Sequence, residues 1–79
     1  MRVVGEIPHS ECKITIFAWN NRYLIKVEQG LLEQTYKLNE YDVASESDLH
    51  TLIDETFIRE TLARFNDMRS SLQHALHRA

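Results

Sequence analysis

The sequence of 79 residues is poor in residues that interrupt or cross-link a chain, with one proline, two glycines and a single cysteine. Because Cys12 is the only thiol, no disulfide can form within the chain, whereas small secreted domains usually contain several. Its apolar runs are far shorter than the ~18 residues that span a bilayer, and no basic segment followed by an apolar one stands at the N-terminus. We therefore expect a cytoplasmic protein without a membrane span or a signal peptide.

The composition is that of a globular protein, with 43% hydrophobic and 27% charged residues. A chain this short can build only one modest core, so residues 1–79 are predicted to form a single domain. The net charge is −3, and the excess of acidic residues lies in residues 39–79, where eight acidic residues face four basic ones. An acidic chain is a poor candidate for electrostatic binding to nucleic acid or to an anionic membrane.

Apolar residues alternate with polar ones from Glu11 to Leu38, which predicts strands separated by tight turns. Asn20 and Asn21 suit a two-residue type I′ loop, because asparagine tolerates a positive φ. The face that this loop would make apolar consists of the pairs Ala18 with Tyr23, Ile16 with Ile25, and Ile14 with Val27.

A second turn is predicted at Gln29 and Gly30. It would continue the apolar face through the pairs Val27 with Leu32, Ile25 with Gln34, and Tyr23 with Tyr36. Upstream, Val3, Gly5 and Ile7 are expected to join the same face. The sequence thus predicts an α+β fold whose sheet is a four-stranded antiparallel meander in the order 1-2-3-4, with strands near residues 2–7, 12–19, 22–29 and 31–38.

Two helices are predicted after the sheet. Ser47 suits the N-cap of a short helix that carries Leu49, and helical spacing of apolar residues continues for about five turns after Phe57. Because Leu49 would face away from that later stripe, we expect a break near Asp54, which can cap a second, long helix. With both helices on one face of the sheet, the predicted core comprises Val3, Ile7, Cys12, Ile14, Ile16, Tyr23, Ile25, Val27, Leu32, Tyr36, Phe57, Ile58, Leu62, Phe65, Met68 and Leu72.

No arrangement of residues predicts an enzyme, a cofactor or a metal site. His9 and Cys12, with Glu11, could place ligands near one metal ion, but a structural zinc site normally takes four ligands and no second pair is present. His74 and His77 share one side of the long helix, where a solvated helix end is the simpler interpretation. We therefore expect no catalytic activity and no bound metal.

The outer face of the predicted sheet combines Phe17, Trp19 and Leu24 with basic residues such as Lys26. These residues allow three interpretations: cross-strand packing, a surface for a protein partner or a second copy, and binding of single-stranded nucleic acid by stacking and phosphate contact. Three glutamates on the same face weigh against nucleic acid. The last interpretation is therefore kept as the alternative.

The long helix is expected to be longer than the sheet that it covers. A helix from Glu55 to His77 would be ~35 Å long, against a sheet diagonal of roughly 30 Å. Its last apolar residues would overhang the sheet and favour burial against a second copy. We therefore predict a small binding or assembly module. Its partner is expected to be a second copy of the chain, which would make it a homodimer, or another protein. The predicted interaction surface comprises Phe17, Trp19, Leu24, Lys26, Leu72 and Leu76.

The stretch from Ile7 to Leu38 reads IPHSECKITIFAWNNRYLIKVEQGLLEQTYKL and resembles short bacterial proteins of unknown function. This resemblance covers under half of the chain. It implies no activity, cofactor or site residue.

Overall fold

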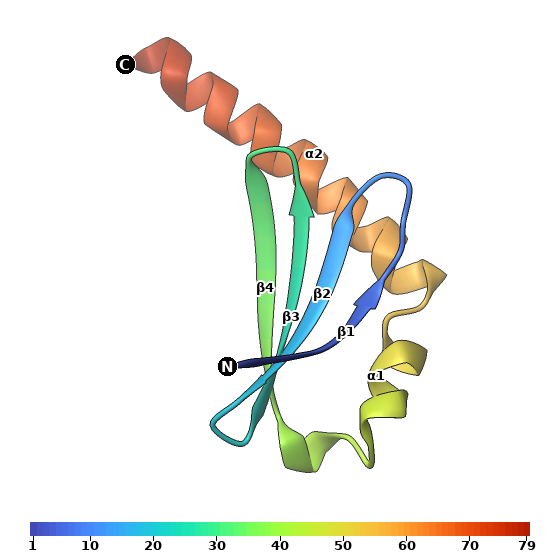
Figure 1. The fold of residues 1–79 in the computed structure, drawn as a ribbon. Helices are drawn as coiled ribbons and strands as arrows, with labels where there is room; N and C mark the ends of the chain where they lie inside the picture. The colour runs from blue at the N-terminus through green and yellow to red at the C-terminus, as the bar shows by residue number, and fades with distance from the viewer.

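The computed structural model describes all residues from 1 to 79 and consists of one antiparallel sheet with two helices on one of its faces (Figure 1). The sheet has the order β1-β2-β3-β4, which confirms the predicted α+β meander. Its strands are β1 (Arg2–Ile7), β2 (Lys13–Trp19), β3 (Arg22–Gln29) and β4 (Leu32–Asn39). After the sheet come the 3-10 helix η1 (Glu40–Asp42), the short helix α1 (Glu46–Leu52) and the long helix α2 (Glu55–Arg78).

The loop between β2 and β3 has the predicted form. Asn20 and Asn21 adopt φ values of 53° and 63°, as a type I′ loop requires of its two central residues. The predicted pairs Ala18 with Tyr23, Ile16 with Ile25, and Ile14 with Val27 are all present. The two asparagines thus set the register of the central hairpin.

The turn between β3 and β4 differs from its prediction by one position in the chain. Gly30 and Leu31 form it, with Gly30 at a φ of 60°, and glycine at the first central position is typical of a type II′ loop. The register therefore shifts by two residues from the predicted one, so that the observed pairs are Gln29 with Leu32, Val27 with Gln34, Ile25 with Tyr36, and Tyr23 with Leu38. Because side chains alternate with a period of two, this shift leaves every residue on its predicted face.

A β-bulge in β1 overturns the prediction that Val3 belongs to the core. Val3 pairs with Phe17 and Gly5 pairs with Ile16, so Val4 is the extra residue on β1. The bulge reverses the alternation of faces before Gly5. Val3 is consequently exposed on the outer face, while Val4 packs against the core.

The break between the helices occurs where it was predicted. Asp54 is the N-cap of α2, and its Oδ1 accepts a hydrogen bond of 2.9 Å from the amide of Phe57. The start of α1 lies earlier than predicted, since Ser45 rather than Ser47 is its N-cap. Asp48 stabilises this start by accepting a hydrogen bond of 3.0 Å from the amide of Ala44.

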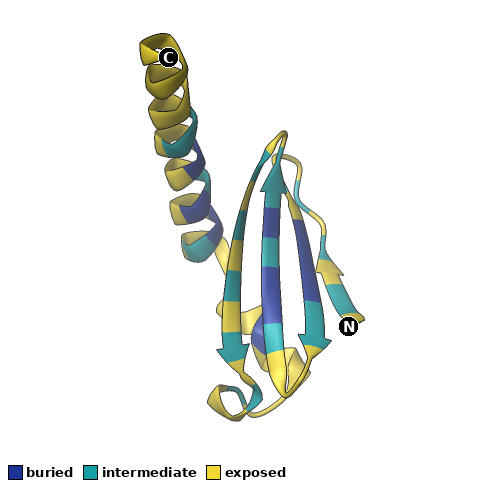
Figure 2. Ribbon diagram, turned by 90° about the vertical axis from the view of Figure 1, so that its left-hand side faces the viewer, coloured by how far each residue is buried: buried dark blue, intermediate teal, exposed yellow.

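The core lies between the inner face of the sheet and both helices (Figure 2). Its buried residues are Ile14, Ile16, Ile25, Val27, Leu49, Ile53, Ile58 and Phe65. Leu49 of α1 and Ile53, the C-cap of this helix, were missing from the predicted core, although both are almost completely buried. Leu72, which was predicted to be in the core, is 50% exposed. The other predicted members apart from Val3 are buried in this cluster or pack against it.

A polar seam joins β4 to α2 beside this core. Gln34 Nε2 donates to the main-chain oxygen of Thr61 at 2.9 Å, and Arg64 Nε donates to Gln34 Oε1 at 3.1 Å. Arg64 Nη2 also donates to Tyr36 Oη at 2.8 Å. The rings of Tyr36 and Phe57 meet edge to face with their centroids 5.4 Å apart. These contacts fix the first half of α2 against the edge strand of the sheet.

Candidate assembly surface

The second half of α2 projects beyond the sheet. In Figure 1, α2 crosses one face of the sheet and continues past the β3–β4 turn to the C-terminus. Every residue from Ser70 to Ala79 is exposed, as Figure 2 also shows for this end of the helix. The apolar stripe that carries Phe65 nevertheless continues at helical spacing to Leu72 and Leu76. Leu72 and Leu76 are thus exposed on a part of α2 that the sheet does not cover.

A groove lies where α2 passes the end of the sheet. It has a volume of about 340 Å³ and is lined by Gln29, Gly30, Leu31, Leu32, Arg69, Leu72 and Gln73. Leu31 and Leu72 are 105% and 50% exposed, and Leu76, one helical turn further, is 66% exposed. Leu31 was not among the predicted interaction residues. The sequence feature that could have identified Leu31 is its position directly after Gly30, because a large apolar residue in a tight turn is exposed to solvent.

The walls of this groove are held together by hydrogen bonds between three segments. Arg69 Nη2 donates to Gln29 Oε1 at 2.9 Å and to Asn66 Oδ1 at 3.0 Å. Gln29 Nε2 donates in turn to the main-chain oxygen of Glu11 at 3.1 Å, in the loop between β1 and β2. Because β3, this loop and α2 are linked in this way, the groove is already formed in the single chain.

The projecting end of α2 carries no acidic side chain. No Asp or Glu follows Asp67, and the last turn of α2 carries His77 and Arg78. Glu28 and Glu33 pair across β3 and β4 next to the β3–β4 turn, and Glu28 Oε1 lies 3.8 Å from Lys26 Nζ. The other ion pair, between Arg2 and Glu46, joins β1 to α1. Within α2, the apolar stripe beyond Asp67 can therefore be covered without removing a carboxylate side chain from water.

The four predicted interaction residues of the sheet lie on its outer face, opposite the helices, so the structure separates them from Leu72 and Leu76. Trp19 is 46% exposed, Phe17 is half-buried, and Leu24 is only 8% exposed against its cross-strand partner Phe17. Lys26 Nζ lies 3.8 Å from Glu28 Oε1. Much of this face is therefore occupied by its own cross-strand contacts.

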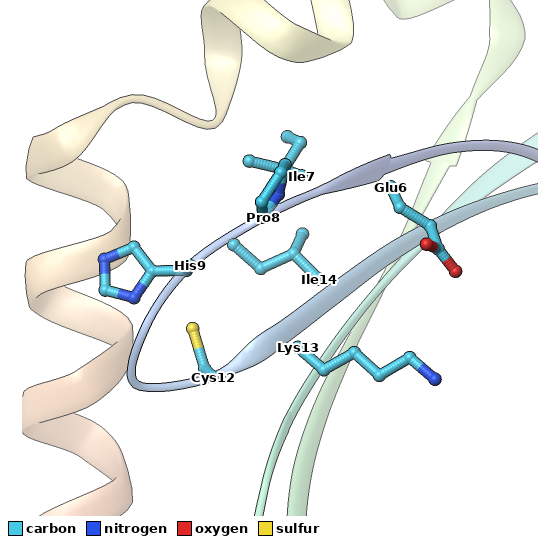
Figure 3. Close-up of a pocket in the computed structure, with 7 residues that line it drawn as sticks. All are labelled: Glu6, Ile7, Pro8, His9, Cys12, Lys13 and Ile14. Carbon is cyan, nitrogen blue, oxygen red and sulfur yellow. The ribbon is translucent and has the colours of Figure 1, made fainter.

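His9 and Cys12 lie at a second recess, of about 290 Å³, at the loop between β1 and β2 (Figure 3). His9 Nδ1 accepts a hydrogen bond of 3.1 Å from the amide of Glu11. Burial raises the pKa of the Cys12 thiol, and the nearby charge of Glu11 raises it further. The thiol is thus disfavoured as a thiolate, the form that binds metals and acts as a nucleophile.

No group of three or more His, Cys, Asp or Glu side chains is arranged to hold a metal ion. No helix combines the length and the apolar content that crossing a membrane requires. Compared with protein-family models, curated proteins and solved structures, the chain gives no significant match. Its function is therefore inferred from its own surfaces.

Proposed function

We propose that the protein is a small assembly module that forms a homodimer and works without a catalytic step, cofactor or metal. The observation that carries this proposal is the apolar stripe of α2, which continues past the sheet and leaves Leu72 and Leu76 exposed beside Leu31. An exposed apolar patch on a small protein is commonly a site of contact with another protein. The single, partly buried thiol suits the reducing cytoplasm, where we place the protein.

The energy available from this patch is of the same size as the cost of forming a dimer. In each copy the exposed fractions of Leu31, Leu72 and Leu76 amount to about two fully exposed leucines, and burying a leucine contributes roughly 1.5 to 3 kcal/mol. A symmetric pair that covered both patches would thus gain roughly 6 to 12 kcal/mol. Association costs about 4 to 15 kcal/mol, so the net gain is at most about 8 kcal/mol. That limit corresponds to a dissociation constant of about 1 μM, and a weaker, concentration-dependent dimer is expected.

The mass of the protein in solution tests this proposal. Light scattering over a concentration series should show a mass that rises from 9.3 kDa toward twice that value as the concentration increases. The rise should be reversible on dilution, because a homodimer held by apolar contacts obeys mass action. A mass that stays at 9.3 kDa up to several hundred micromolar would contradict self-association.

Binding of single-stranded nucleic acid is the alternative function. It is supported by the end of the β2–β3 hairpin, where a recess of about 270 Å³ is lined by Trp19 together with Arg2 and Arg22. The half-exposed indole of Trp19 could stack on a base while its cross-strand partner Arg22 contacts phosphate. The net charge of −3 and the pairing of Lys26 with Glu28 make this function the weaker candidate.

A further inference from the structure

We infer that the dimer interface is an antiparallel pairing of the two projecting α2 segments, in which Leu76 of each copy fills the groove of the other. This inference rests on the proposed self-association and assigns it to one surface. The groove is the one between the β3–β4 turn and α2, with Leu31, Leu32 and Leu72 as its apolar walls. A second copy of the same chain supplies the occupant, because its own Leu76 is an exposed apolar side chain.

The chain presents both halves of such a contact on one continuous surface. Leu76 stands on the stripe that includes Leu72 and lies about 6 Å further along the helix, at ~1.5 Å per residue. It extends beyond its own groove and is 66% exposed. In a closed two-fold interface, a contact of one residue with a second is repeated in reverse, so one protruding residue and one groove in each copy are sufficient.

The antiparallel orientation follows from the position of the sheet on α2. With a two-fold axis level with residue 74, Leu72 lies opposite Leu76 of the other copy, and each Leu76 reaches the neighbouring groove. The two sheets then lie at opposite ends of the helix pair and do not collide. A parallel pair would place both sheets at the same end and would leave both grooves unfilled. Antiparallel helices also align the opposite ends of their dipoles.

The residues that flank the stripe permit close contact between the helices. Ala75 lies on one side of the stripe and Gln73 on the other, and neither is charged. Arg69, the charged residue that lines the groove, is held toward its own chain by hydrogen bonds to Gln29 and Asn66. Helices with such flanks can pack with their axes roughly 8 to 10 Å apart.

Disulfide trapping tests the orientation directly. In a two-fold antiparallel pair the same flank of each helix faces its equivalent, so Ala75→Cys in a Cys12→Ser background places two thiols close together. Mild oxidation of this variant should give a covalent dimer on a non-reducing gel. The matched control is His74→Cys, one residue earlier and on the side of the helix that faces away from the partner. This variant should form no covalent dimer and should run as a monomer on the same gel. Equal cross-linking of both variants, or none with Ala75→Cys, would overturn the antiparallel pairing.

Substitution at the interface tests which surface is used. Leu76→Asp and Leu31→Lys should each weaken dimerisation at least roughly tenfold, because each alters both contacts of the pair. Mixing the two variants should restore part of the affinity, since the mixed dimer contains one unchanged contact and one pair of opposite charges. The control Trp19→Asp, on the outer face, should leave the dimer intact. Circular dichroism of all three variants should match the wild type, since each site is exposed.

The outcomes separate this inference from the proposed function. A dimer that survives Leu76→Asp but dissociates with Trp19→Asp would overturn the helix interface and leave self-association standing. A wild-type chain that is monomeric at all concentrations would overturn both. Loss of the dimer with Leu76→Asp together with recovery on mixing would support both.

Discussion

Gln34 of β4 donates a hydrogen bond to the main-chain oxygen of Thr61 in α2, across a distance of 2.9 Å. Gln34 Oε1 accepts further hydrogen bonds from Arg64 and from Tyr36, both at 3.1 Å. The one polar residue on the inner face of β4 thus has partners at both of its side-chain atoms. It joins the edge of the sheet to the long helix.

Replacing this residue should weaken the attachment of α2 to the sheet. We expect Gln34→Ala to lower the free energy of unfolding by about 1 to 3 kcal/mol, because partners in the seam lose their hydrogen bonds. Urea denaturation followed by circular dichroism measures this change. The neighbouring Glu33→Ala, on the exposed outer face, should change stability by less than about 0.5 kcal/mol. Equal losses in both variants would show that the seam contributes nothing specific.

The two leucines of α1 should differ sharply in their contribution to stability. Leu49 is fully buried in the core, whereas Leu52 in the same helix is exposed. We expect Leu49→Ala to cost about 2 to 5 kcal/mol, as the truncation of a core leucine usually does. Leu52→Ala should cost less than about 1 kcal/mol. Chemical denaturation of both variants measures the difference, and similar costs would contradict the packing of α1 against the sheet.

The Cys12 thiol should react slowly in the folded protein. Its pKa is raised by burial and by Glu11, so at about pH 8 it should be alkylated more slowly than in urea. A pKa higher in the folded state than in the unfolded state means that the protonated thiol favours folding. This contribution is complete below the unfolded pKa and is lost as the pH rises through the folded pKa.

The rate of alkylation by iodoacetamide, with and without urea, checks this expectation. Glu11→Gln removes the charge that adds to the shift, so it should lower the pKa of Cys12 and speed the reaction of the folded protein. Equal rates in the folded and unfolded states would contradict a buried thiol.

The nucleic-acid alternative predicts binding that falls steeply as salt is added. The fluorescence anisotropy of labelled single-stranded DNA and RNA at low salt should then rise with protein concentration. Binding should be lost when Trp19→Ala and Lys26→Ala are combined, because stacking and phosphate contact would both be removed. The absence of binding at high micromolar protein, or binding that this double variant leaves unchanged, would eliminate the alternative.

Features that depend on a few neighbouring residues could be predicted from the sequence. The Asn20–Asn21 loop was predictable because asparagine adopts positive φ at little cost, and it set the register of β2 with β3. The break before α2 was predictable because Asp54 can cap the helix through an amide only three residues away. The alternation of apolar residues determined the inner face, even where the β3–β4 register was misplaced by two residues.

Features that depend on how the elements meet were decided only by the tertiary structure. Val4 bulges out of β1 and turns Val3 to the outside. The adjacent Gly5 is a local sign of a bulge, but it does not specify which neighbouring residue is the extra one. Leu49 is buried because α1 packs against the inner face of the sheet. Leu72 is exposed because α2 extends beyond the end of the sheet. Phe17, Trp19, Leu24 and Lys26 share the outer face of the sheet, whereas the placement of α2 on the inner face puts Leu72 and Leu76 on a different surface. Hydrophobic patterns specify which residues favour burial away from water. The relative length and placement of the sheet and the helices decide which of these residues are actually buried.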